Sequence, residues 1–361
     1  MAGENPKTAA EYDSNIRAYT IFCSYMLLCI SLAVFIIRNL LVSFNSLSPP
    51  GFNRRHVLLF SFLATASLCT TWYYMYQYFV DSYQRWVYWQ EFYGRPIVNL
   101  ELGRWLRETE LFREAWLAAI VGVHRYWWTA QIFLFACGLG LNLEQKGTRK
   151  GIKHTWAFML LGQVVAISFA TNLFLISLLL TPKSCKPAQK DAPRKNKWIG
   201  PWLLNFIAVF GTLWPAYSLQ DPEFQAPPHI LHPPRFLRLL LVPHFVLLLL
   251  PIARAVLPTK YVSDEDVPFA DRAYNFMWNI VIGGGGMLVL KASAAVWREF
   301  GFSVLVPTLF ETPAVSSVGW DVIFCWITWY AWWKVQKVSF DDVIGVEGSV
   351  EEKEVEVEET N

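Results

Sequence analysis

Charged residues are scarce in this 361-residue chain. Asp, Glu, Lys and Arg make up 17% of it and hydrophobic residues 54%, whereas soluble globular domains carry roughly 25% charge. The formal net charge is only +2, so no excess of basic residues indicates a nucleic-acid-binding protein. Because 16% of the residues are aromatic, the chain is neither disordered nor collagen-like. The composition predicts an integral membrane protein.

Several motifs that would identify an enzyme are missing. No G-x-x-x-x-G-K-[ST] run occurs, which excludes a P-loop ATPase. No D-D-x-x-D run occurs either, which argues against an enzyme that ionises diphosphates with magnesium. The His residues never repeat at the spacings of a membrane di-iron oxygenase, and the Cys residues form no C-x-x-C pair. We therefore expect no metal site and no disulfide framework, and no nucleic-acid or obligate protein partner is evident.

Long apolar runs dominate what is present. A membrane-spanning helix needs about 20 mostly apolar residues, and these runs are too long and too unbroken for barrel strands. We predict an all-α integral membrane protein, a polytopic bundle of about eight transmembrane helices plus an interfacial amphipathic helix. The predicted spans are residues 18–37, 57–80, 126–143, 156–180, 198–217, 236–257, 273–297 and 318–335.

The bundle is expected to form one domain over residues 18–340, after a cytosolic segment at 1–17. Within it, residues 85–125 place Trp and Arg at helical spacing, which predicts a helix lying in the membrane interface. Residues 183–197 form a basic, proline-containing linker suited to anionic lipid. Residues 341–361 form an acidic tail that we predict to be disordered.

The distribution of Lys and Arg predicts the orientation. These residues are more numerous in the N-terminal segment, the connections after the second, fourth and sixth spans, and the C-terminal tail than in the alternate connections. The positive-inside rule then predicts that both termini face the cytosol. The first apolar run is longer than that of a signal peptide and no A-x-A-like site follows it, so it predicts a signal anchor at the endoplasmic reticulum.

Ionisable groups inside apolar helices are candidate functional sites, because removing them from water is costly. Asp321, Thr328 and Trp332 fall on one helical stripe of the last predicted span. A buried carboxylic acid there could donate a proton; the alternative is an interfacial Asp near the helix end. Glu110 and Glu114, four residues apart, are reserve acids, although exposed helix charges are the commoner case.

The aromatic content suggests a class of chemistry. Aromatic faces attract cations and exclude water. Few buried acids and many aromatic rings fit the protonation of an epoxide or alkene, followed by steering of a carbocation. Aromatic belts and hydrogen bonds between helices explain the same residues without any chemistry.

Four segments resemble a known family: R-Y-W-W-T-A-Q at 125–131, L-R-E-T-E-L-F-R-E-A-W at 106–116, G-W-D at 319–321, and the apolar run at 156–182. In these segments, in their order and in the eight-span layout, the chain resembles the fungal membrane-bound terpene cyclases of the ascofuranone/ascochlorin type. The resemblance covers about residues 15–340. The membrane cyclases of indole-diterpene pathways are shorter, with about seven spans, and match less well.

The resemblance implies a cyclase of the endoplasmic reticulum in meroterpenoid secondary metabolism. Its substrate would be a farnesylated aromatic polyketide with a terminal epoxide, and no metal or redox cofactor would be needed. Protonation opens the epoxide, after which a hydroxyl closes an oxygen ring or an alkene closes a carbocycle; the sequence leaves both outcomes open. We assign Asp321 as the acid, with Glu110 and Glu114 in reserve. The expected substrate-binding residues are Arg125, Trp127, Trp128, Gln131, Asn172, Trp329 and Trp332.

Two other classes of protein remain open. A metabolite transporter would need a polar path through the membrane. A non-catalytic membrane scaffold would be tightly packed, without a cavity of about 300–1,000 Å³ that could hold a prenylated phenol.

Overall fold

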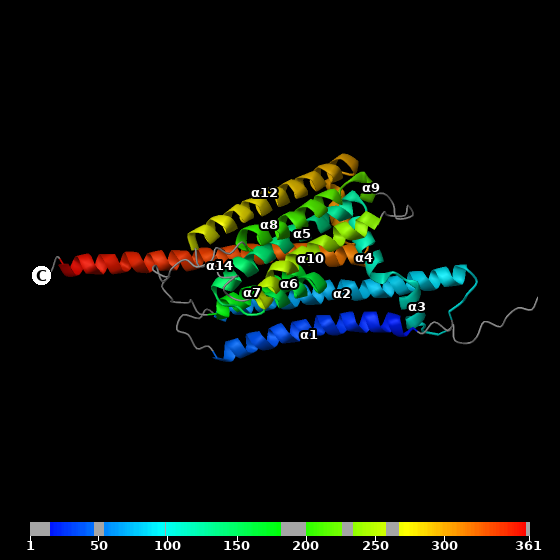
Figure 1. Cartoon of the computed structure of the whole chain (residues 1–361), viewed down its shortest axis with the longest axis horizontal. Helices are drawn as coiled ribbons and strands as arrows, with labels where there is room; N and C mark the ends of the chain where they lie inside the picture. The colour runs from blue at the N-terminus through cyan, green and yellow to red at the C-terminus, as the bar shows by residue number, and fades with distance from the viewer. Residues whose placement is uncertain are drawn as a thin grey trace, which may run out of the picture.

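The computed structural model describes residues 15–46, 54–97, 99–181, 200–225, 234–257 and 267–358. Every regular element in these ranges is helical, which confirms the all-α prediction. The long helices lie side by side along one axis (Figure 1). The elements are α1 (Ile16–Ser46), α2 (Arg54–Phe92), α3 (Leu102–Glu108), α4 (Leu111–Ile120), α5 (Val123–Asn142), a π-helical turn η2 (Leu143–Gly147), α6 (Thr155–Val164), α7 (Ile167–Leu180), α8 (Gly200–Ser218), α9 (Pro222–Gln225), α10 (Pro234–Val256), α12 (Val267–Glu299), a 3₁₀ turn η3 (Phe302–Val304), α13 (Leu305–Thr308) and α14 (Pro313–Glu358).

The helices have the length and the surface of a membrane protein. Four of them, α1, α2, α10 and α12, are long and apolar enough to cross a bilayer. Large apolar side chains on these helices point away from the bundle, among them Leu58, Phe245 and Leu290, each about 70% exposed. A surface rich in such side chains suits contact with lipid rather than water. The membrane class predicted from composition is therefore supported, while the count of eight crossings is not.

The predicted fourth span, residues 156–180, forms two helices. α6 and α7 contain 10 and 14 residues, and at 1.5 Å per residue neither reaches across a hydrocarbon core of about 30 Å. Lys150, which precedes α6, donates a hydrogen bond to the carbonyl of Leu178 near the end of α7 (2.6 Å). The hairpin therefore enters and leaves the bundle at the same end. Almost every residue of α7 is buried, which explains why its sequence is as apolar as that of a true span.

The α6–α7 junction has local causes. Gly162 and the β-branched residues Val164, Val165 and Ile167 have low helix propensity. Ala166 adopts an extended conformation (φ −167°, ψ 138°) just before α7. Non-helical backbone at membrane depth is tolerated only where protein buries it or a cavity adjoins it. The α6–α7 junction is therefore a candidate location for a binding or catalytic site.

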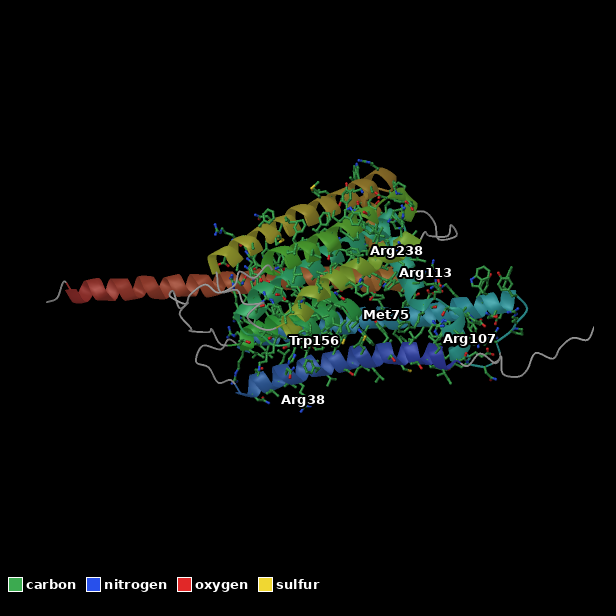
Figure 2. All side chains as sticks on the ribbon, viewed as in Figure 1. Arg38, Met75, Arg107, Arg113, Trp156 and Arg238 are labelled. Atoms are coloured by element: carbon green, nitrogen blue, oxygen red, sulfur yellow. The ribbon has the colours of Figure 1, made fainter. Side chains whose placement is uncertain are left out.

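The two ends of the described chain lie at opposite ends of the bundle. α1 begins at one end and α14 runs out past the other (Figure 1). Figure 2 shows Arg107 of α3 and Arg113 of α4 towards the end where α1 begins, and Arg38 of α1 and Trp156 of α6 towards the other end. The prediction of two cytosolic termini counted residues 156–180, which form α6 and α7, as one crossing.

Residues 85–125 do not form the single interfacial helix that we predicted. α2 extends into this segment, and the rest forms α3 and α4. Trp105 of α3 is only 4% exposed, and the hydroxyl of Tyr78 in α2 donates a hydrogen bond to the carbonyl of Leu111 in α4 (2.8 Å). Trp105 packs α3 against α2, where its indole N–H donates to Ser82 (3.3 Å), whereas Trp89, Phe92 and Tyr93 near the end of α2 are more than half exposed.

Three of the predicted segments are terminal or linking: residues 1–17, 183–197 and 341–361. α14 continues through Glu358, and the disorder that we predicted for the acidic tail at 341–361 stays a prediction. Glu and Lys are good helix formers, and no proline follows Pro313 to end the helix. The basic linker at 183–197 and residues 1–14 of the predicted cytosolic segment lie outside the described residues.

Candidate active site in the membrane bundle

A cavity of about 340 Å³ lies where the α6–α7 junction meets α2, α4, α5, α10 and α14. This volume falls at the lower end of the range for small-molecule sites. The short helix α4 contributes Phe112, Ala115, Trp116 and Ala119 to the wall. Other apolar side chains in the wall are Met75, Phe79, Ile132, Phe133, Leu240, Leu247 and Val318.

Asp321 of α14 lies in this wall and is 8% exposed. One of its carboxyl oxygens accepts a hydrogen bond from the backbone N–H of Ile167 (2.9 Å), and the other accepts one from the N–H of Ser168 (2.8 Å). Both N–H groups belong to the first turn of α7, where a helix has no internal acceptors for them. The carboxyl group therefore caps α7 and lies at the positive end of its dipole.

The hydroxyl groups in the wall are largely occupied by backbone carbonyls. Tyr25 donates to the carbonyl of Val164 at the end of α6 (2.7 Å), and Thr129 donates to the carbonyl of Ala119 in α4 (2.6 Å). A hydroxyl has a single proton, so while these bonds hold neither group can donate to a ligand.

His244 of α10 is the other ionisable group of interest in the wall. Its Nδ1 lies 2.9 Å from the carbonyl oxygen of Leu240. A carbonyl can only accept, so Nδ1 carries a proton and Nε2 of the neutral ring has a free lone pair. The side-chain amide of Gln163 donates to the backbone carbonyl of His244 (3.2 Å), which ties α10 to the end of α6. Asp321 and His244 therefore give the described wall one carboxyl and one imidazole for proton exchange.

The reserve acids lie away from the cavity. Glu110 pairs with Arg113, and its side chain is 66% exposed. Glu114 accepts a hydrogen bond from the backbone N–H of Glu110 (3.0 Å), which stabilises the start of α4. Neither residue lines the cavity, so we leave both out of the proposed site.

The polar residues predicted to orient the substrate form contacts between structural elements. Arg125 pairs with Glu311, which precedes α14. Gln131 accepts a hydrogen bond from the indole N–H of Trp326 (2.9 Å), and Asn172 donates one to a hydroxyl of α14 (2.9 Å). None of the three lines the cavity. The alternative of helix–helix hydrogen bonding describes their contacts better than substrate binding does.

The tryptophans predicted to line a cation's path also lie elsewhere. Trp127 donates its indole N–H to a hydroxyl of α12 (2.9 Å), and Trp128 donates to the carbonyl of Leu305 (3.2 Å). Trp329 and Trp332 border a separate space of about 10 Å³, room for about one water molecule. Of the predicted site residues, the structure places Asp321 alone in the wall of the large cavity.

Two features of the site were missed at the level of sequence. His244 is an ionisable residue in an apolar span, the same signal that selected Asp321. The aromatic residues of α4 were noticed but assigned to the membrane interface. Their part in the wall depends on α4 packing over the cavity, which no local pattern reveals.

In the part of the chain that the structure describes, no three His, Cys, Asp or Glu side chains gather closely enough to hold a metal ion. The wall of the cavity holds the carboxyl group of Asp321, the imidazole of His244 and several aromatic rings. No family model matches this chain, and the searches of curated proteins and of solved structures found no match either.

Proposed function

We propose that this protein is a membrane-embedded terpene cyclase that opens a terminal epoxide on a prenylated aromatic substrate and closes a ring. The observation that carries the proposal is the position of Asp321, a buried carboxyl group in the wall of a largely apolar cavity. Acid-triggered ring closure needs a proton donor and a space without water. The resemblance of segments such as 106–116 and 156–182 to fungal membrane cyclases suggests the substrate class.

The first step is proton transfer from Asp321 to the epoxide oxygen. The bond from that oxygen to the more substituted carbon breaks, its electron pair stays on oxygen as a hydroxyl, and the carbon becomes cationic. The carboxylate left on Asp321 keeps the N–H groups of Ile167 and Ser168 as donors. Hydrogen bonds to an ionised acceptor are about twice as strong as those to a neutral one. The start of α7 therefore favours the state after proton transfer.

The wall suits the cation that follows. Phe79, Phe112, Trp116 and Phe133 present aromatic rings to the cavity, and each such face stabilises a nearby cation by about 0.5–2 kcal/mol. An alkene or a hydroxyl of the substrate then attacks the cation and closes the ring. The overall change is an isomerisation, in which every proton donated is returned.

The membrane arrangement that we infer has seven crossings, by α1, α2, α5, α8, α10, α12 and α14, with the α6–α7 hairpin re-entering from the side of the C-terminus. The segments at that side, which include residues 183–197, contain more Lys and Arg than those at the other side. The positive-inside rule then assigns that side to the cytosol. The N-terminus and α4 would face the lumen of the endoplasmic reticulum.

A metabolite transporter is the second candidate, and the discontinuous α6–α7 pair favours it. In many transporters, half-helix ends near the membrane midplane bind the substrate. Such folds carry the broken helices in both halves of an internal repeat, and no second discontinuous pair occurs among the described helices. A cavity of about 340 Å³ argues against a purely structural scaffold.

The test is an assay of microsomes that contain this one protein, fed a farnesylated phenol epoxide without added cofactor. We expect an isomer of unchanged mass, whose ring is identified by NMR, and no such product from Asp321→Asn. Recovery of only the epoxide or its spontaneous diol, from protein shown to be folded, would overturn the cyclase. Uptake of the epoxide into vesicles without chemical change would favour the transporter.

A further inference from the structure

His244 is held in one tautomer within the wall that also holds Asp321. Its Nδ1–H donates to the carbonyl of Leu240 four residues earlier, so the Nε2 lone pair is left as the basic position. His244 is ten residues from the start of α10, and Asp321 is eight residues from the start of α14. Both helices start at the same end of the bundle. The two residues are therefore at similar depth, roughly 12–15 Å along their helices.

The surroundings of His244 suit a base for a hydrocarbon. The ring centroid of Trp116 lies 6.4 Å from that of the His244 imidazole, with the two ring planes tilted by 42°, so an aromatic ring that excludes water lies beside the base. Leu240, Leu247 and Phe133 are among the apolar neighbours in the same wall. The hydroxyl groups of Tyr25 and Thr129 donate to backbone carbonyls, and a neutral hydroxyl oxygen is a far weaker base than an imidazole nitrogen.

We infer that His244 is the base that ends the reaction, by removing a proton from carbon so that the cyclised product carries a new C=C bond. This inference rests on the proposed function. Nε2 takes the proton from the carbon next to the cation, the C–H electron pair forms the double bond, and the positive charge is lost. The imidazolium returns its proton to the Asp321 carboxylate through solvent water when the product leaves. The donor and the acceptor of the reaction are thereby both restored.

This assignment distinguishes between the two kinds of ring. A hydroxyl oxygen that attacks the cation becomes a protonated oxonium ion, a strong acid that loses its proton to any nearby oxygen and leaves a cyclic ether. A carbocation in a cavity that excludes water needs a base held beside the carbon. A positioned imidazole therefore points to closure by an alkene and to an unsaturated carbocycle as the product.

The test uses the full-length protein in microsomes, a farnesylated phenol epoxide as the probe, and product analysis by mass and NMR. In His244→Asn the amide N–H can still donate to Leu240, but the base is gone. We expect this variant to consume the epoxide while the unsaturated carbocycle falls at least tenfold relative to ethers and water-trapped alcohols. His154→Asn is the matched control, because His154 is exposed, precedes α6 and does not line the cavity. Its left-handed backbone (φ 59°) suits Asn.

If His244→Asn fails to fold, His244→Ala with added imidazole replaces it, and imidazole should restore the unsaturated product. An unchanged product ratio in folded His244→Asn, or no effect of imidazole on His244→Ala, would overturn the assignment. Wild-type protein that makes only an ether would also overturn it while leaving the cyclase in place. Wild-type protein that leaves the epoxide unchanged would overturn the proposed function, and this inference with it.

Discussion

The carboxyl group of Asp321 in α14 accepts a hydrogen bond from the backbone N–H of Ser168 at the start of α7, with a donor–acceptor distance of 2.8 Å. The two residues are 153 positions apart, so this contact exists only in the folded bundle. It places an acid, a helix N-terminus and the wall of a cavity at one point. The proposed chemistry and the stability of the hairpin therefore depend on the same side chain.

Replacing Asp321 should separate these two roles. Loss of an N-cap side chain costs about 0.5–2 kcal/mol of stability. Asp321→Asn keeps one acceptor oxygen but has no carboxylic acid, and Asp321→Ser has only a shorter hydroxyl group in place of the carboxyl group. We expect both variants to fold with a modest fall in Tm and to lose turnover by about 100-fold or more. Turnover that merely follows the fraction of folded protein would mean that Asp321 has a structural role only.

Filling the cavity should block the substrate without unfolding the protein. Ala115 of α4 lines the cavity and Ala118, one turn along the same helix, does not. Both are half-buried, so each can accept a larger side chain with similar strain. We expect Ala115→Phe to lower kcat/KM at least tenfold more than Ala118→Phe does, through a higher KM or a lower kcat. Equal effects in the two variants, measured by titration of the epoxide, would place the substrate elsewhere.

The α6–α7 hairpin predicts on which sides of the membrane the two termini lie. Because α6 and α7 leave the bundle at the end where they enter, the N- and C-termini should lie on opposite sides of the membrane. In sealed microsomes, protease should remove a C-terminal tag and leave an N-terminal tag intact until detergent is added. Removal of both tags before detergent would restore the eight-span arrangement and contradict the inferred seven crossings.

The ion pair between Arg125 and Glu311 should make the stability of the fold depend on pH. The direction of this dependence follows from the pKa of Glu311. The hydrogen bond from Arg125 lowers the pKa of Glu311 below its ordinary value of 4.5, and His124 approaches the same carboxylate at 3.4 Å. A lowered pKa means that the unfolded chain binds the proton more tightly, so the pair stabilises the fold above about pH 4.5. That contribution is lost as the pH falls through the lower pKa of the folded state.

Glu311→Gln should therefore be less stable than wild type at pH 7, by no more than about 1 kcal/mol because the pair is partly exposed. Thermal unfolding in detergent between about pH 7 and pH 3 is the measurement. We expect the two Tm curves to converge at the acid end. Curves that stay parallel across this range would show that the pair contributes nothing that depends on protonation.

The sequence determined the membrane class and the helical architecture. Apolar runs such as 57–80 and 236–257 are long enough that only a buried or lipid-facing helix satisfies their backbone, so α2 and α10 follow from composition and length alone. Asp321 was found in the same way, because an acid in an apolar helix stands out without any knowledge of its neighbours.

Only the tertiary structure decided how the run at 156–180 is used and what surrounds Asp321. Apolar content records that a segment avoids water, and a re-entrant hairpin buried in protein avoids water as fully as a spanning helix does. The hairpin exists because Asp321 and other side chains from distant helices supply the partners that its broken backbone needs. Trp127 and Trp329, in contrast, were expected to line the cavity and do not. They were predicted to bind the substrate, but which neighbour an indole ring meets depends on packing between helices.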